Sequence, residues 1–383
     1  MEADKWHARN VRLQRGGEEK AGAFNETTRS QLASQGFAVI SAVLRQDECA
    51  KAVDLAWDFV EAASKAKNRV LKGDYSNHVD RADPDTWHNG NWPRCVEGGI
   101  IPFCGAGQSR CAWYVRSHHK IREVFAGLWQ TEDLVVSFDG LLLWRDWRTL
   151  NRMEYRTEEG WFHIDQNPRK KQDFCCVQGL VNLLPNSGYI EGNVLVAGSH
   201  LSFPHHFLQH TDEDLRTFYL SRLDQVQDED WLEVHPKDSL LHNNVICCHL
   251  DAGDLLLWDS RVVHCSYPSA IGATREEQAE LSSGDRMVLE HAKGLTRAAV
   301  MVCYVPAERV DARIKEERVE AVGRGATLSH WPDKLQALGA EQQADAEKER
   351  EMIEDMMQTS SALLPASELS DEQWKLVYGR DCQ

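Results

Sequence analysis

No uninterrupted apolar run in this 383-residue chain approaches the ~18 to 20 residues that a membrane-spanning helix needs. The first residues, Met1 to Trp6, also lack the basic start and apolar stretch of a signal peptide. Basic residues are outnumbered, with 43 Lys and Arg against 60 Asp and Glu, a formal net charge of −17. Such a field repels nucleic-acid phosphates and anionic lipid surfaces. We expect a cytoplasmic protein that binds neither nucleic acid nor membranes, and the oligomeric state stays open.

The cysteines lack a pattern as well. Eleven occur, an odd number, and none are spaced CxxC, which disfavours a disulfide framework. Most lie in apolar runs such as FCCV and VICC, where cysteine behaves as a small hydrophobic residue. Hydrophobic residues make up 42% and charged residues 27% of the chain, close to the usual globular balance. We therefore expect reduced thiols in a protein with a packed core.

The composition divides the chain into three parts. Residues 1–29 are mostly polar and are expected to form a mobile arm. Residues 30–306 are expected to form one domain with N-terminal helices and loops that cover a site. Residues 307–383 are expected to form a helical extension packed on or beside that domain. Within the extension, the charged run at 341–358 predicts a solvated helix face.

The central part is expected to be mainly β with flanking helices. Helical spacing of apolar residues predicts a helix at 46–67, another at 119–130 and a third, inserted among the strands, at 213–226. Residues 70–115 are rich in Gly, Asn, Asp, Trp and Pro and predict long irregular loops. Short apolar stretches bounded by turn residues predict a sandwich, jelly roll or barrel. The predicted strands are 36–40, 134–144, 174–184, 193–199, 245–250, 254–259 and 298–305.

The segment Gly160 to Pro168 contains the triplet His163-Ile164-Asp165. In an extended chain, residues two apart point to the same side, so an imidazole nitrogen and a carboxylate oxygen can hold one ion between them. Such a triplet arises easily by chance among 16 histidines and 60 acidic residues. Its alternative interpretation is an ordinary surface pair.

A second histidine strengthens the metal interpretation. His264 follows the apolar run GDLLLWD, at a position from which a third ligand can reach the same ion. Two histidines and one carboxylate on one face of an iron leave positions for a chelating 2-oxoacid and for dioxygen. Zinc is the competing ion, but it usually takes four-coordinate sites. The pattern indicates an oxygenase.

A cosubstrate with a distal carboxylate needs a fixed cation, preferably an arginine that can bind it in bidentate fashion. Arg275 lies in the polar stretch ATREEQAE, whereas Arg297 opens an apolar strand and is the favoured candidate. Ser266, two residues after His264, is a candidate for a second hydrogen bond to the same carboxylate. Gln178 and Asn182 are further candidates, at the other end of the cosubstrate.

Six segments between residues 30 and 306 share their order with the motifs of a known family. They are GFAVI (36–40), DLVVSFDG (133–140), WFHIDQ (161–166), GNVLVAGSH (192–200), GDLLLWDSRVVH (253–264) and the strand that opens with Arg297. Together they resemble the phytanoyl-CoA dioxygenase family of Fe(II)- and 2-oxoglutarate-dependent oxygenases.

The resemblance implies a double-stranded β-helix core, a cupin-like jelly roll. It implies Fe(II) held by His163, Asp165 and His264, and 2-oxoglutarate held by Arg297 with help from Ser266. Members that halogenate have a small residue in place of Asp165, so hydroxylation or desaturation with dioxygen is implied, with release of succinate and carbon dioxide. The 33 residues from His264 to Arg297 exceed the family's short turn, which leaves Arg275 open as the alternative.

Three function classes compete. The first is a dioxygenase of a small organic substrate. The second is a protein or peptide hydroxylase or demethylase of the related cupin type, and the third is a non-catalytic descendant that binds metal. His205, His206 and His210 suggest a second metal site, but a polar loop or helix face is the favoured interpretation. Trp113, Trp161 and Trp258 are candidates for lining the pocket.

Overall fold

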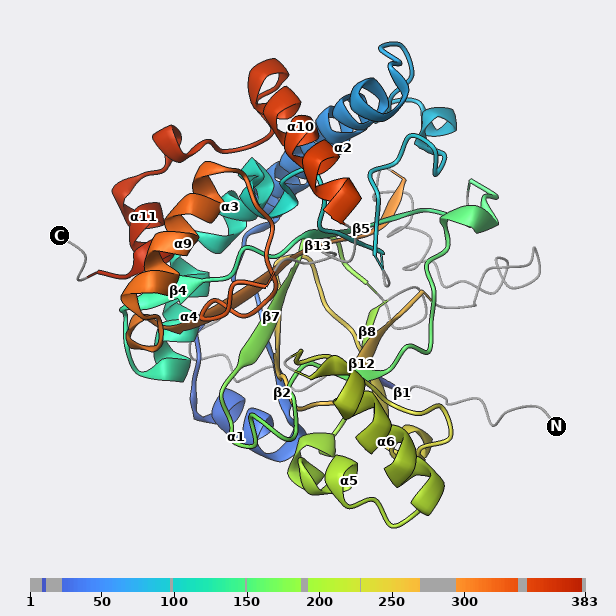
Figure 1. Cartoon of the computed structure of the whole chain (residues 1–383), viewed down its shortest axis with the longest axis vertical. Helices are drawn as coiled ribbons and strands as arrows, with labels where there is room; N and C mark the ends of the chain where they lie inside the picture. The colour runs from blue at the N-terminus through green and yellow to red at the C-terminus, as the bar shows by residue number, and fades with distance from the viewer. Residues whose placement is uncertain are drawn as a thin grey trace.

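Two β-sheets packed face to face form the centre of the protein, and helices surround them (Figure 1). The fold is known from a computed structural model. The residues that the structure describes are 9–11, 23–96, 99–148, 150–186, 192–227, 229–268, 294–336 and 343–380.

The sheets are antiparallel except where β1 runs parallel to β10. In sheet order, the larger consists of β2 (Phe37–Ile40), β11 (Leu255–Asp259), β7 (Val177–Asn182), β13 (Leu295–Pro306), β5 (Leu141–Arg145) and β3 (Ile100–Ile101), and β4 (Leu134–Val136) pairs with β13. The other consists of β1 (Arg9–Val11), β10 (Val245–Cys248), β8 (Gly192–Val196), β12 (His264–Tyr267), β6 (His163–Ile164) and β9 (Leu232–Glu233).

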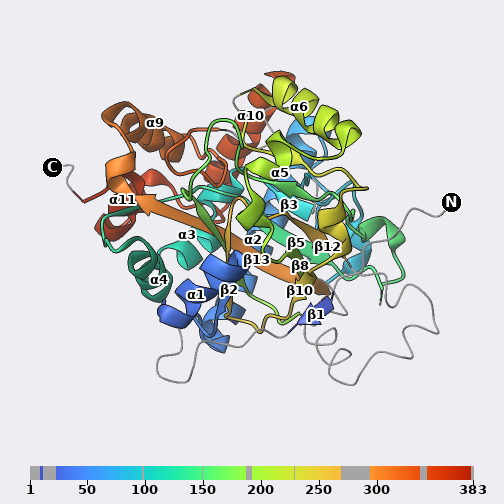
Figure 2. The ribbon, with the colours of Figure 1, turned by 90° about the horizontal axis from the view of Figure 1, so that it is seen from below.

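Along the chain, the core strands are shared between the two sheets. Strands β5, β7, β11 and β13 lie side by side in the larger sheet, and β6, β8, β10 and β12 lie in the other. The chain thus winds between the sheets as a double-stranded β-helix, and the predicted jelly-roll fold is confirmed. Strand β13 is 12 residues long and crosses the middle of the molecule (Figure 2).

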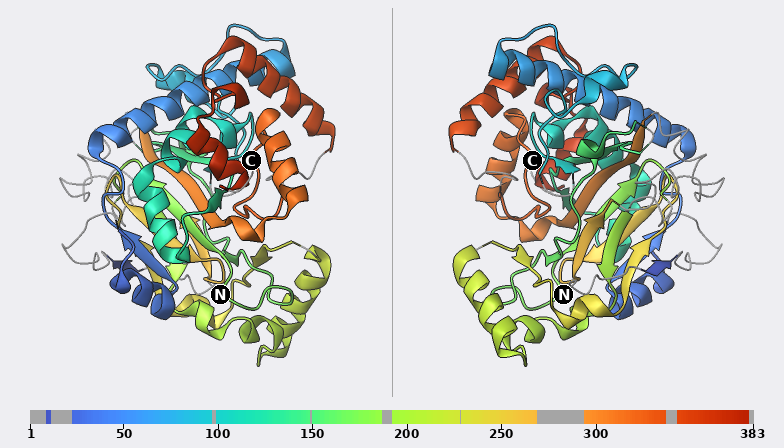
Figure 3. Two further views of the ribbon diagram at one scale, coloured as in Figure 1. Left: turned by 90° about the vertical axis from the view of Figure 1, so that its left-hand side faces the viewer. Right: turned by 90° about the vertical axis from the view of Figure 1, so that its right-hand side faces the viewer.

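Most helices cover one side of the larger sheet, and a short helical insertion between β8 and β9 lies at the opposite end of the molecule (Figure 3). The insertion holds α5 (His205–Leu208) and α6 (Glu213–Val226), so the predicted helix at 213–226 is confirmed. The other helices are α1 (Glu26–Gln35), α2 (Gln46–Lys72), α3 (Arg110–Arg116), α4 (His119–Trp129), α9 (Ala312–Gly323), α10 (Gln343–Thr359) and α11 (Asp371–Tyr378).

The larger sheet is buried on both faces, which explains why its strands are apolar without alternation. On β11, Leu256 and Trp258 point between the sheets, whereas Leu255 and Leu257 pack in the cluster that contains the apolar side of α2. Each fully buried leucine contributes roughly 1.5 to 3 kcal/mol. Helix α2 ends at Gly73, whose φ of 62° is the left-handed conformation that glycine adopts without strain.

The predicted strand at 134–144 is wrong in one respect, because Ser137 to Gly140 interrupt it. Strand β4 pairs with the end of β13 and β5 with its beginning. Between them the chain approaches other backbone so closely that a Cβ on Gly140 would lie 2.4 Å from the Ile101 carbonyl oxygen. The apolar run at 134–144 therefore forms two strands instead of one.

One further prediction needs correction, and another is incomplete. Residues 70–115 are not loops throughout, because Ser109 caps α3 by accepting a hydrogen bond from the Ala112 amide. The charged run at 341–358 forms α10, but one side of this helix is buried. Met352, Ile353 and Met356 join the main core, where α10 packs against α2. In the sequence, the many charged residues around these three apolar residues made the helix look polar on all sides.

The boundary expected after the arm falls within α1, whereas the boundary expected before the extension coincides with the end of β13 at Pro306. Helix α1 begins at Glu26, before the expected domain start, and the arm lies mostly outside the described residues. In the part of the chain with assigned positions, no helix combines the length and the apolar character required to cross a membrane. The ten cysteines described there are free thiols.

Candidate metal centre

Two neighbouring strands bring the predicted metal ligands together. His163 opens β6 and His264 opens β12, and the two residues are directly opposite each other in the antiparallel ladder. Their ring centroids are 4.3 Å apart. Asp165 follows β6, where its amide donates to the Ser260 carbonyl, and points to the same side as His163. The pairing of β6 with β12 thus brings together three side chains that are up to 101 residues apart in sequence.

The ligand atoms of the three side chains are close enough to share one ion. The Nε2 atom of His163 lies 3.6 Å from one Asp165 oxygen, and the Nε2 atom of His264 lies 3.2 Å from the other. Ligands at right angles around a metal at ~2.1 Å are about 3 Å apart. The observed separations therefore fit a common metal ion.

Backbone carbonyls set the orientation of both imidazoles. The Nδ1–H of His163 donates to the Trp161 carbonyl at 3.1 Å, and the Nδ1–H of His264 donates to the Val262 carbonyl at 2.9 Å. In a neutral imidazole with its proton on Nδ1, the Nε2 atom carries the lone pair that binds metal. Both Nε2 atoms point at Asp165, so the tautomers match a metal site.

The electrostatics favour the ligand forms of these groups. Burial and the neighbouring His163 lower the pKa of His264, which keeps its imidazole neutral. Burial opposes ionisation of Asp165, but the two imidazoles outweigh it and hold the pKa of this carboxyl well below its usual range. Gln178 on β7 donates from Nε2 to Asp165 at 2.8 Å. Gln178 therefore contacts a candidate ligand, a position that its sequence context did not indicate.

Arg297 lies on β13 and is 1% exposed, in the space between the sheets. One of its amino groups donates to Asn193 Oδ1 on β8, and its guanidinium stacks over the Trp144 ring at 4.6 Å. Asn193 is directly opposite Ser266 in the ladder, and Ser266 is two residues from His264 on the same strand. Arg297, on β13 of the larger sheet, thus bonds a residue of β8 that pairs with Ser266 on β12, the strand that carries His264.

The other cosubstrate candidates lie elsewhere. Asn182, at the end of β7, donates to the Leu184 carbonyl and is tied to Asn186 and Leu250. It supports the turn after β7 and is not among the residues around His163. Arg275 falls outside the described residues.

Aromatic rings surround the two histidines. The indole of Trp161 lies parallel to the His163 ring, at 4.9 Å and 12°, and Trp231 lies near it at 5.8 Å and 29°. Trp258 lies 5.5 Å from the His264 ring. Trp113 is instead fully buried on α3, where it donates to Gln108, so the interpretation of Trp113 as a pocket residue is wrong.

Three residues of this region were missed by sequence reasoning. Asn193 is a lone polar residue in the apolar run GNVLV, a signal that could have indicated a buried partner. Trp144 ends an apolar run that predicted only a strand. Trp231 gave no signal, because it lies in a polar stretch far from His163 in sequence.

A cavity of about 440 Å³ lies beside β5, and its lining contains none of the candidate metal ligands and neither Arg297 nor Ser266. Its lining includes Trp144, which supports Arg297, and Glu158, whose carbonyl accepts the Trp161 indole N–H at 3.3 Å. This volume falls within the range of small-molecule pockets, about 300 to 1,000 Å³.

A second cluster of the same composition joins two histidines of the insertion to Asp238, which follows β9. His206 Nε2 donates to Asp238 Oδ2 at 2.8 Å, and His210 Nε2 lies 3.8 Å from the same oxygen. The hydroxyl of Tyr219 also donates to this oxygen. The amide of Asp212 donates to His210 Nδ1 at 3.1 Å, so a neutral His210 carries its proton on Nε2. This cluster is a hydrogen-bond network, although its atoms are close enough for a metal.

Comparison with known proteins gives partial similarities. No family model matches the chain. Ava biosynthesis cluster protein O of Aspergillus versicolor is 30% identical over 201 residues, which are 52% of this chain and 62% of that protein. The chain therefore spans less than two thirds of the length of this curated relative.

The similar solved structures share low identity with the chain. The non-heme alpha ketoglutarate dependent carbocyclase SnoK from nogalamycin biosynthesis is 15% identical, with 76% of this chain and 88% of that chain covered and a TM-score of 0.41. EctD from S. alaskensis with bound Fe is 14% identical, with 78% and 84% covered and a TM-score of 0.42. The hypothetical protein JW0805 from Escherichia coli is 12% identical, with 92% and 82% covered and a TM-score of 0.48. The phytanoyl-CoA dioxygenase resemblance stays a prediction.

Proposed function

We propose that this protein is an Fe(II)- and 2-oxoglutarate-dependent dioxygenase, similar to phytanoyl-CoA dioxygenases, that hydroxylates or desaturates a small organic substrate and releases succinate and carbon dioxide. The observation that carries the proposal is the convergence of His163, Asp165 and His264 with both Nδ1 protons bound to backbone carbonyls. A cytoplasmic location is part of the proposal.

The donor set favours iron over zinc. Two imidazoles and one carboxylate are the facial set of non-heme iron oxygenases, whose six-coordinate ion keeps three positions for other ligands, whereas zinc with such ligands is usually four-coordinate and keeps one. Bound iron and 2-oxoglutarate would together supply the activation of dioxygen that oxidation of a C–H bond requires. Asp165 occupies the third ligand position, which supports hydroxylation or desaturation over halogenation.

The protein's own residues would hold and orient these groups. Gln178 fixes the Asp165 carboxylate, and the backbone carbonyls fix the two imidazoles. Arg297 would bind the distal carboxylate of 2-oxoglutarate, with its planar guanidinium oriented by Asn193 and Trp144. Ser266 would donate a second hydrogen bond.

Water exclusion is the other contribution of the fold. Leu195, Leu256 and Trp258 are buried between the sheets and form part of the apolar cluster beside Arg297 and the metal ligands. A dry environment strengthens the ion pair between the arginine and the cosubstrate and protects reactive species from side reactions.

The name of the Aspergillus relative mentions a biosynthesis cluster, which supports a small organic substrate over a protein substrate. The test of the proposal is anaerobic reconstitution with Fe(II) and 2-oxoglutarate, followed by addition of oxygen and measurement of succinate. We expect oxygen-dependent succinate formation even without the true substrate. A folded, metal-loaded protein that forms no succinate with any substrate of a metabolite and peptide panel would contradict the proposal.

A further inference from the structure

Trp231 is an exposed aromatic residue beside a metal ligand. Its side chain is 38% exposed, and it is the one tryptophan among the exposed large hydrophobic residues of the described chain. Single exposed apolar residues are ordinary on protein surfaces. What distinguishes Trp231 is its position, because its ring is stacked 5.8 Å from the imidazole of His163.

Trp161 extends the same aromatic arrangement. Its indole is half-buried and lies within 12° of the His163 plane, and its N–H donates to the Glu158 carbonyl. Two indoles thus lie nearly parallel to one candidate ligand ring. Parallel aromatic faces favour offset stacking with another flat ring, and each such contact adds to the apolar area that is buried.

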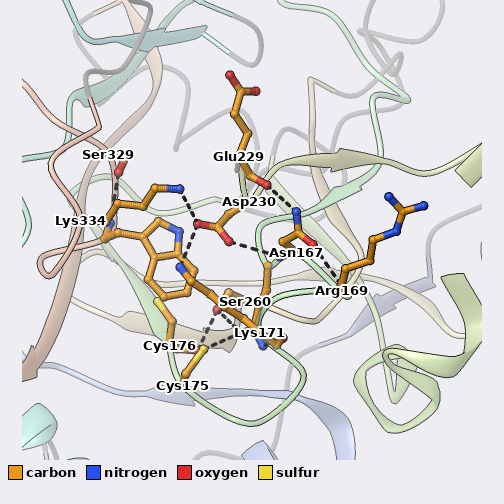
Figure 4. Close-up of polar contacts among 12 residues, drawn as sticks. Asn167, Arg169, Lys171, Cys175, Cys176, Glu229, Asp230, Ser260, Ser329 and Lys334 are labelled. Carbon is orange, nitrogen blue, oxygen red and sulfur yellow. Dashed lines mark hydrogen bonds and ion pairs between the residues drawn. The ribbon is translucent and has the colours of Figure 1, made fainter. Parts of the chain in front are cut away.

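Asp230, the neighbour of Trp231, ties this part of the chain to two other segments (Figure 4). Asp230 is 4% exposed and accepts hydrogen bonds from the Asn167 amide at 3.3 Å, from Lys171 Nζ at 2.9 Å and from Lys334 Nζ at 3.2 Å. Asn167 and Lys171 belong to the loop that follows Asp165, and Lys334 belongs to the C-terminal extension.

This anchoring has a consequence for binding. The Lys171 ammonium also lies 3.3 Å from the centre of the Trp331 ring, so the same network contains a packed cation–π contact. A segment held at this many points keeps its side chain in place before a ligand arrives, which lowers the entropy cost of binding. An exposed tryptophan on a segment that is fixed in this way is suited to ligand recognition.

We propose that Trp231 and Trp161 form a stacking platform for a planar, unsaturated ring of the substrate. The inference rests on the proposed function, because it places this ring beside the metal that His163 would hold. A puckered, saturated ring of the same size cannot make the same face-to-face contact and binds more weakly.

The test compares two probes with one carbon skeleton, 2-naphthol and decahydro-2-naphthol. Their dissociation constants are measured by equilibrium dialysis against the full chain with Fe(II) and 2-oxoglutarate under anaerobic conditions, and again without metal. We expect the flat probe to bind at least tenfold more tightly, about 1.4 kcal/mol. Trp231→Leu should weaken 2-naphthol binding about fivefold to tenfold and leave decahydro-2-naphthol nearly unchanged, and Trp231→Phe should restore most of the difference.

Tyr75→Leu is the matched control, since Tyr75 is a 79% exposed aromatic on the loop after α2. Equal dissociation constants for the two probes, or a Trp231→Leu protein that binds 2-naphthol like the Tyr75→Leu protein, would overturn the inference. A separate Fe(II) titration keeps the two proposals apart. Metal binding without a flat-ring preference rejects the platform alone, and a flat-ring preference without metal binding rejects the dioxygenase proposal while the platform stands.

Discussion

The described residues include two clusters of two histidines and one aspartate, and these clusters differ in which imidazole nitrogen carries the proton. At His163 and His264, backbone carbonyls accept from Nδ1 and leave Nε2 directed at Asp165. At His210, a backbone amide donates to Nδ1, so the proton sits on Nε2 and points at Asp238. The first arrangement offers lone pairs to a metal, and the second offers a proton to a carboxylate.

The comparison shows that composition and proximity do not define a metal site. Within each cluster, the possible ligand atoms lie within 4.8 Å of one another. Asp238 already accepts hydrogen bonds from His206, the Tyr219 hydroxyl and the Leu240 amide. Its burial opposes ionisation, but the bonds from His206 and Tyr219 outweigh burial and lower its pKa. These hydrogen bonds join the insertion to the segment that contains Asp238.

The largest effect is expected from removal of a ligand at the first cluster. Asp165→Ala or His163→Ala should abolish Fe(II) binding at micromolar metal and oxygen-dependent succinate formation, because two protein ligands cannot hold the ion. Metal content after dialysis, measured by elemental analysis, checks this. His206→Ala is the control and should keep one iron per chain. A His206→Ala protein that loses its iron would break the distinction between the clusters.

Asp238→Ala should act on stability instead. It leaves the buried Tyr219 hydroxyl and His206 without their acceptor, at a cost of about 2 to 4 kcal/mol in the free energy of unfolding. Urea denaturation measures the loss. Tyr219→Phe removes one donor to Asp238 and the acceptor of the His235 amide but leaves Asp238 in place, so it should cost less, about 1 to 2 kcal/mol. Iron affinity of the folded Asp238→Ala protein should equal that of the unmodified protein, and a lost iron would contradict the network interpretation.

Arg297→Lys should raise the half-saturating concentration of 2-oxoglutarate about 10- to 100-fold, because an ammonium cannot make the bidentate contact. Fe(II) affinity should not change, since Arg297 bonds Asn193 and not a candidate ligand. Succinate formation at varied 2-oxoglutarate checks the first statement and a metal titration the second. An unchanged half-saturating concentration of 2-oxoglutarate would show that Arg297 does not bind the cosubstrate and would favour Arg275.

The smallest effect is expected for Gln178→Ala. It removes the hydrogen bond that orients Asp165 and should weaken Fe(II) about tenfold, the lower range for residues that contact a metal ligand. Asn182→Ala, on the same strand, should lower stability through the turn after β7 and leave iron affinity unchanged. Equal iron affinity in both variants would show that the hydrogen bond from Gln178 to Asp165 does not contribute to metal binding.

Features encoded locally were predictable from the sequence. His163 and Asp165 share a side because strand geometry repeats every two residues, and apolar runs bounded by turn residues located most strands. Pairing across the sheet was not predictable, because it depends on long-range register. For that reason Asn193 beside Arg297, Trp231 beside His163 and Asp238 beside His206 appeared only in the structure.

A crystal structure of the protein grown without oxygen, with Fe(II) and 2-oxoglutarate, tests the central claim most directly. We predict one anomalous iron peak about 2.1 Å from the Nε2 atoms of His163 and His264 and from an Asp165 oxygen, with the distal carboxylate of 2-oxoglutarate on Arg297. An iron peak between His206, His210 and Asp238, or no iron at His163, would contradict the account.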